Sequence, residues 1–107
     1  MSIDLPESDW KLFRELRELA LERLCKRALD GLQPRIEDRS RTYYDRYLDI
    51  FQFLKERDRE VARAFDDPKR SQMIHQLAAM QDLGLLESEE LSRFSTRTRE
   101  KLQALAV

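Results

Sequence analysis

The chain has 107 residues, of which 41% are hydrophobic and 38% charged. Twenty basic and 21 acidic residues leave a formal net charge of −1, which excludes strong electrostatic attraction to nucleic acid or to an anionic membrane. Only two Gly and three Pro are present, which favours long helices over a β-sheet protein. We therefore expect residues 1–107 to form one helical domain with a modest core.

The first predicted helix covers about residues 7–38. No helix breaker occurs between Trp10 and Gly31. Pro34 removes a helical hydrogen bond, so the helix either ends near Gly31 or bends there and continues. Its apolar residues form two clusters about 130° apart around the helix, which predicts that the two halves pack against different neighbours. The clusters are Leu12, Phe13, Leu16, Leu19 and Ala20, and then Leu21, Leu24, Cys25, Ala28, Leu29 and Leu32.

The second predicted helix covers about residues 41–65, with Ser40 as its expected N-cap. It carries six of the eight Phe and Tyr residues of the chain. Most of its apolar residues recur at steps of three and four, so they share one face, which we expect to be buried. The face consists of Tyr44, Tyr47, Phe51, Leu54, Val61 and Phe65.

Two residues of this helix depart from the pattern. Asp58 falls on the apolar face, four residues after Leu54. Either the face reaches an edge there, or Asp58 is a polar contact that fixes the register of a helix pair or a dimer. Phe53 lies off the face, so we expect it to point away from the first helix and to need a cover from elsewhere.

Three shorter helices are predicted in the C-terminal third of the chain. Asp67 and Pro68 mark the start of the first, and Gly84, which accepts the left-handed conformation, marks its end. Met73 and Met80 lie at helical spacing within it. The predicted ranges are about 68–83, 89–94 and 96–105.

The expected fold class is all-α, with a long antiparallel hairpin and short C-terminal helices packed back on it. The short segments cannot cover every apolar side of two long helices. We therefore expect a homodimer in which two hairpins form a helical bundle, together with a possible unidentified protein partner. The candidate interaction residues are Phe53, Asp58, Trp10, Met73 and Met80.

Catalysis and cofactor binding find little support in the residue types. One His and one Cys are present, without HExxH, CxxC, a calcium-binding loop or a glycine-rich phosphate loop, so we expect no enzyme activity, no catalytic residue, no metal site and no cofactor. We interpret His75 as a surface or boundary residue and Cys25 as a small buried hydrophobic residue.

The alternative function is binding of nucleic acid or a phosphate ligand at the start of the second long helix. The segment 39–47, RSRTYYDRY, combines guanidinium groups and aromatic rings with a helix N-terminus. Acidic neighbours and the balanced net charge oppose this interpretation. The residues concerned are Arg39, Arg41, Tyr43 and Arg46.

The sequence therefore predicts a non-enzymatic protein-interaction or regulatory module. The segment from Met1 to Trp10 has no basic residue, and no apolar run approaches the length of a membrane span, so we expect a cytoplasmic protein without membrane contact. The single cysteine suits a reducing compartment. Residues 83–100, LGLLESEELSRFSTRTRE, resemble segments of small bacterial helical proteins, a resemblance that implies no activity.

Overall fold

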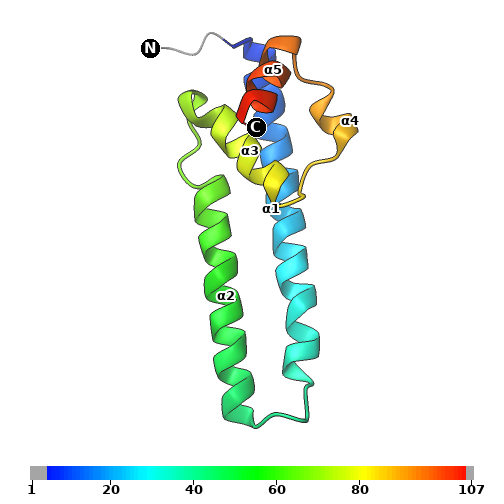
Figure 1. Cartoon of the computed structure of the whole chain (residues 1–107), viewed down its shortest axis with the longest axis vertical. Coiled ribbons are helices and arrows are strands. Elements are labelled where there is room, and N and C mark those ends of the chain that lie inside the picture. Colours follow the sequence, from blue (N-terminus) through cyan, green and yellow to red (C-terminus); the bar gives the residue numbers. More distant parts are fainter. Residues whose placement is uncertain (1–4, 106–107) are drawn as a thin grey trace.

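The computed structural model describes residues 5–105, and these are all-α, as predicted (Figure 1). Two long helices form an antiparallel hairpin, and shorter helices pack back against one end of it. No strand occurs within the described range. The elements are α1 (Glu7–Ile36), α2 (Tyr43–Phe65), the 3-10 turn η1 (Arg70–Gln72), α3 (Met73–Asp82), α4 (Ser88–Leu91) and α5 (Thr96–Leu105).

The first helix runs through both of its potential breakers. α1 contains Gly31 and Pro34 and ends at Ile36, slightly before the expected residue 38. Pro34 lies in the last turn, where one lost hydrogen bond costs the helix little of its length. Arg46 of α2 donates its Nη1 to the Ile36 carbonyl at 2.7 Å, which satisfies one of the acceptors left open at a helix end.

The N-cap of α2 is Thr42, so the prediction of Ser40 is wrong. The Thr42 hydroxyl oxygen accepts a hydrogen bond from the Asp45 N–H at 3.0 Å. Ser40 instead donates its N–H and its hydroxyl to one carboxylate oxygen of Asp38, which closes a tight turn ahead of the helix. These hydrogen bonds from Ser40 lower the pKa of Asp38.

The molecule divides into two regions of different packing. We call residues 5–24 and 64–105 the head, and residues 25–63, which form the far end of the hairpin, the arm. No residue of the arm is buried. The protein is elongated, 54 × 27 × 25 Å, because the arm extends beyond the short helices (Figure 1). The hydrophobic core lies in the head and comprises Phe13, Leu16, Ala20, Leu24, Ala64, Phe65, Met73, Ile74, Leu77, Ala79, Met80, Leu85, Phe94 and Leu102.

A buried carboxylate of α1 caps the last helix. Asp9 is only 3% exposed and accepts hydrogen bonds from the N–H of Ser95 at 3.1 Å and from its hydroxyl at 2.6 Å. The hydroxyl of Thr98 donates to the same carboxylate. Asp9 therefore satisfies donors at the N-terminus of α5, where negative charge is also favoured by the helix dipole.

Two arginines of α1 bind the C-terminal end of α3. That helix ends in a Schellman motif, in which Gly84 has a φ of 70° and the N–H of Leu85 donates to the Met80 carbonyl at 3.0 Å. Arg27 donates to the Gly84 carbonyl, and Arg23 donates to the Leu85 carbonyl at 2.8 Å. The positive side chains thus lie at the negative end of the α3 dipole.

Arg23 also holds α4 against the head through a bidentate ion pair. Its two terminal nitrogens lie 2.7 and 2.8 Å from the carboxylate oxygens of Glu90, which is buried. Glu90 also accepts the N–H of Glu87 at 2.8 Å in a capping box. The hydrogen bonds from Arg23 lower the pKa of Glu90 despite its burial.

Candidate interaction surface

The aromatic face of α2 is exposed along the arm, although we expected it to be buried. Tyr44, Tyr47 and Phe51 are 68%, 63% and 54% exposed, and Leu54 is also exposed. Only the end of the face reaches the core, where Phe65 is 1% exposed. The prediction is wrong for the arm because α1 packs against a different side of α2, and the short helices extend only over the head.

Phe53 points towards α1, so the prediction that it points away is wrong. A Cβ atom added to Gly31 of α1 would lie 2.7 Å from the tip of the Phe53 ring. The guanidinium carbons of Arg35 and Arg57 lie 4.2 and 4.9 Å from the ring centroid, on cation–π geometry. Because Phe53 lies two residues after Phe51, it projects about 200° further around the helix.

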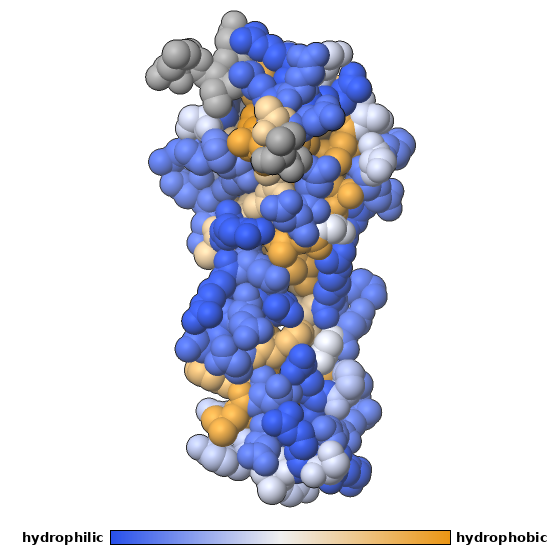
Figure 2. Space-filling model, viewed as in Figure 1, coloured by the Kyte–Doolittle hydropathy of each residue, from blue (hydrophilic) through white to orange (hydrophobic). Residues whose placement is uncertain are grey.

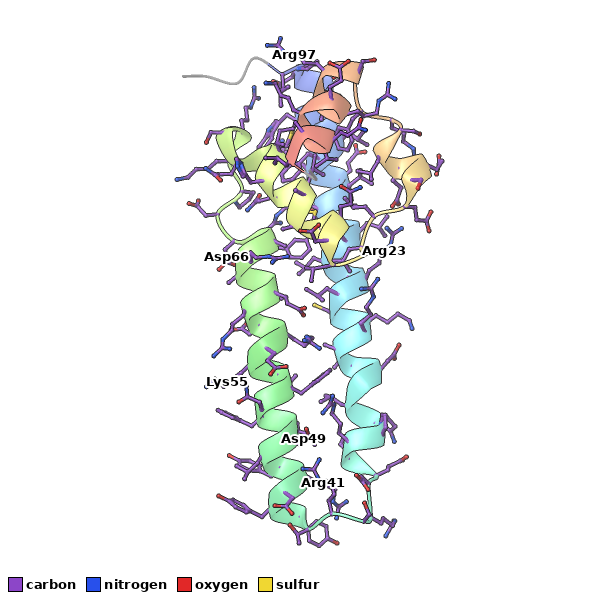
Figure 3. The ribbon with its side chains drawn as sticks, in the orientation of Figure 1. Arg23, Arg41, Asp49, Lys55, Asp66 and Arg97 are labelled. Atoms are coloured by element: carbon purple, nitrogen blue, oxygen red, sulfur yellow. The ribbon has the colours of Figure 1, made fainter. Side chains whose placement is uncertain are left out.

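The contact between the two helices of the arm combines the packing of Phe53 with ion pairs. Arg35 of α1 pairs with Asp49 of α2 at 2.7 Å, and Arg41 approaches the same carboxylate at 3.6 Å. In Figure 3, Asp49 and Arg41 lie between the helices, whereas Lys55 projects from the outer side of α2. Tyr44, Tyr47 and Phe51 are therefore not used to join the hairpin, and Phe53 is the aromatic residue of α2 that contacts α1.

The exposed apolar residues of α1 lie on the same side of the hairpin as those of α2. Successive residues of an α-helix are rotated by about 100° about its axis. In the direction of the chain, Leu29 and Ile36 lie about 130° around the axis of α1 from the side that contacts α2. Tyr47 and Phe51 lie about 130° round α2 in the same sense. Because the two helices are antiparallel, equal rotations from their facing sides bring both groups of residues to the same side of the hairpin. We call this surface the hairpin face: Leu29, Ile36, Tyr43, Tyr44, Tyr47, Phe51 and Leu54, all exposed.

The other side of the arm is charged and polar. There Lys26 pairs with Asp30 at 2.7 Å, and Gln52 donates to Glu56 at 3.3 Å. Figure 2 shows a mostly hydrophilic lower part of the molecule, with hydrophobic residues in the groove between the helices and at the left edge, where α2 lies. The arm is therefore amphipathic as a unit, with one side suited to water and one to protein contact.

Asp58 is exposed and follows the hairpin face towards the head. Lys55, one turn before it, lies with its ammonium group 5.7 Å from the Phe51 ring centroid. The burial of Asp58 that its spacing suggested does not occur in the single chain. Its role in fixing the register of a dimer stays a prediction.

The other expected interaction residues belong to the head. Met73 and Met80 are 1% and 0% exposed, so the expectation that they contact a partner is wrong: both fill the core. Trp10 is half-buried and stacks on Phe13 with ring centroids 5.4 Å apart. Cys25 is exposed instead of buried, because it lies on a different side of α1 from its buried neighbour Leu24.

The arginine and tyrosine cluster of the alternative function is engaged within the hairpin. Arg46 lies 4.6 Å from the Tyr43 ring centroid while donating to the Ile36 carbonyl, and Arg41 approaches Asp49. Arg39 is exposed. Two of the three guanidinium groups thus help to close the corner between the helices. Few positive charges are then left to bind a phosphate group.

A polar hollow of about 430 Å³ lies beside α3, between the end of α2 and the exposed His75. Arg63, Asp66 and Asp67 line it with charges of both signs. Gln76 donates to the Asp66 carbonyl at 2.8 Å, and its buried Oε1 has no hydrogen-bond partner among the described residues. The mixed charges do not define one class of ligand.

Comparison of the chain with protein-family models, curated proteins and solved structures finds no match. Among residues 5–105, no group of three or more His, Cys, Asp or Glu side chains is placed to hold a metal ion. Within the same range, no helix has both the length and the apolar character needed to cross a membrane.

Proposed function

We propose that the protein is a non-catalytic helical module that binds another protein chain through the hairpin face. The observation that carries this proposal is the exposure of Tyr44, Tyr47 and Phe51 along one side of a helix that does not need them for its own packing. Tyrosine and phenylalanine are enriched in the centres of protein interfaces. As part of the proposal we keep a cytoplasmic location, because a single exposed cysteine suits a reducing compartment.

The exposed area is large enough for this role. If a full aromatic side chain presents about 200 Å², the four rings of the hairpin face expose roughly 500 Å² at their observed exposures. Monomeric proteins rarely expose contiguous apolar patches above a few hundred Å², and larger patches mark interaction sites. Covering the rings at about 25 cal/mol per Å² would release on the order of 10 kcal/mol before the costs of association.

Phosphate or nucleic-acid binding receives less support. The guanidinium groups of Arg41 and Arg46 already contact Asp49 and the Ile36 carbonyl, so a phosphate would have to displace partners within the protein. The aromatic residues beside them continue along α2 away from the arginines, in the pattern of an apolar interface.

Photo-crosslinking from two positions of α2 tests the proposal. A benzophenone amino acid replaces Tyr47 on the hairpin face in one variant and Gln52 in the other. Gln52 is an exposed residue on the charged side of the same helix, which makes it the matched control. The tagged full chain is irradiated in cells of its source, and adducts are isolated under denaturing conditions and identified by mass spectrometry.

We expect protein adducts from position 47 and few from position 52. Equal yields at both positions, or no protein adduct from position 47, would contradict the proposed function. The identity of the adducted chain, whether the same sequence or another protein, is a separate readout.

A further inference from the structure

We propose that the chain seated on the hairpin face is a second copy of this protein, with the two α2 helices antiparallel and Tyr47 of each against Phe51 of the other. This inference rests on the proposed function and adds the partner and its orientation. A two-fold interface requires a surface that is complementary to itself, so each contact occurs twice. The hairpin face meets that requirement.

The spacing of the aromatic face fixes the register. Tyr44, Tyr47, Phe51 and Leu54 recur at three- and four-residue steps, symmetric about the point midway between Tyr44 and Leu54. An antiparallel pair centred there places Tyr44 opposite Leu54 of the partner subunit and Tyr47 opposite the partner's Phe51. Every exposed apolar residue of the series then faces another apolar residue.

The charges at the two ends of the face select the antiparallel orientation. Asp58 follows the apolar series at the end near the head, and Arg39 and Arg41 lie at the other end, beyond the start of α2. In the antiparallel register, Asp58 lies just beyond the start of the partner's α2, near the corner that carries the exposed Arg39 and near the positive end of that helix. A parallel pair would place the two Asp58 carboxylates at the same level, where like charges repel.

The area agrees with a dimer of this kind. Stable interfaces bury about 800 Å² on each partner. The aromatic rings supply roughly 500 Å² of this, and Leu54 and the exposed α1 residues Leu29 and Ile36 add to it. The head does not obstruct the approach, because every residue of the hairpin face is exposed.

Light scattering over a range of protein concentrations gives the first test. The full chain should have twice its mass of 12.8 kDa. Phe51→Glu should give the single-chain mass, whereas Gln52→Glu on the charged side should leave the dimer unchanged. Circular dichroism of both variants, with unchanged helix content, shows that the loss of mass does not come from unfolding.

Thiol crosslinking tests the orientation. In a Cys25→Ser background, Tyr44→Cys and Leu54→Cys proteins are oxidised separately and as an equimolar mixture. In the proposed register Tyr44 lies opposite the partner's Leu54, whereas the two Tyr44 positions are about 15 Å apart along the helix axis. A disulfide needs Cα atoms within about 7 Å. We therefore expect crosslinked dimer from the mixture only.

The outcomes separate the two proposals. A single-chain mass at every concentration, or a crosslink from Tyr44→Cys alone, overturns the antiparallel dimer. If photo-crosslinking from position 47 then yields another protein, the proposed function stands and only the identity of the partner changes. Adducts with the chain itself, together with crosslinking in the mixture alone, support both.

Discussion

One face of α2 continues from the arm into the head, and it is exposed in the arm and buried in the head. On α2 the same series of three- and four-residue steps leads from Phe51, which is 54% exposed, to Phe65, which is 1% exposed. The two environments differ because α3 packs against the end of α2, whereas no segment within residues 5–105 buries the aromatic side of its beginning. Periodicity in a sequence thus identifies a face to be covered, and it does not say whether the same chain provides the cover.

The largest difference in stability should come from replacing phenylalanine by alanine once in the head and once in the arm. Phe65→Ala should lower the free energy of unfolding by about 3–5 kcal/mol, since it opens a cavity in the core. Phe51→Ala should change it by less than about 1 kcal/mol at concentrations where the protein is monomeric. Urea denaturation of both variants measures the contrast. Similar losses in the two variants would show that the arm is packed as tightly as the head.

The cap that Asp9 provides for α5 should be the next most sensitive point of the head. Asp9→Ala leaves the buried hydroxyl of Thr98 and the half-buried donors of Ser95 without their acceptor, and we expect a loss of about 2–3 kcal/mol in the free energy of unfolding. Asp9→Asn keeps one acceptor oxygen and should lose less. Thermal melts followed by circular dichroism rank the variants, and equal stability of Asp9→Ala and the parent protein would refute the role of the cap.

The ion pair between Arg23 and Glu90 should make the stability of the head depend on pH. The pKa of Glu90 lies below its ordinary value of 4.5 because Arg23 donates hydrogen bonds to it. The pair therefore stabilises the protein fully above about pH 4.5, and this stability is lost as the pH falls through the lowered pKa. Glu90→Gln should cost about 1–3 kcal/mol at neutral pH.

The decisive measurement is the difference in unfolding free energy between the parent protein and Glu90→Gln from pH 7 to pH 3. This difference should shrink below about pH 4.5. The control is Glu89→Gln, which removes an exposed pair with Arg93 and should have little effect at any pH. A difference that stays constant with pH would be at odds with a lowered pKa of Glu90.

The smallest expected effect distinguishes Thr42 from Ser40 as the N-cap of α2. Thr42→Ala should destabilise the start of α2 by about 1 kcal/mol, because the Asp45 N–H loses its acceptor. Ser40→Ala should have a smaller effect, since Ser40 contacts only the turn. Amide hydrogen exchange of the first turn of α2 is the suitable measurement, and faster exchange in Ser40→Ala than in Thr42→Ala would reverse the assignment.

Local rules of helix formation were sufficient to predict the fold class from the sequence. Gly84 takes the left-handed conformation that we expected at the end of α3, and the hairpin follows from two long segments joined by a short corner. The neighbours of each face were not predictable in this way. Phe53 was excluded from the contact with α1 because it lies off the aromatic series, yet the arm joins its helices through Arg35, Phe53 and Arg57.

Long-range polar contacts were also beyond the sequence. Asp9 resembled an ordinary acidic residue in the first turn of a helix, and its partner Ser95 lies 86 residues away. The pairing of Arg23 with Glu90 spans 67 residues. Only the buried position of each carboxylate distinguishes it from the many exposed acidic residues of the chain. For the candidate surface, the spacing identified the residues and predicted the wrong environment for them.

The long reach of the Asp9 cap determines the order in which the two regions can form during synthesis. The arm needs only contacts between neighbouring segments, so both of its helices have been synthesised well before the last residues of the head. The head needs Ser95 and Thr98 to complete the cap, and therefore waits for almost the whole chain. Two nascent chains on one polysome would thus expose their aromatic helices to each other before either has a finished core.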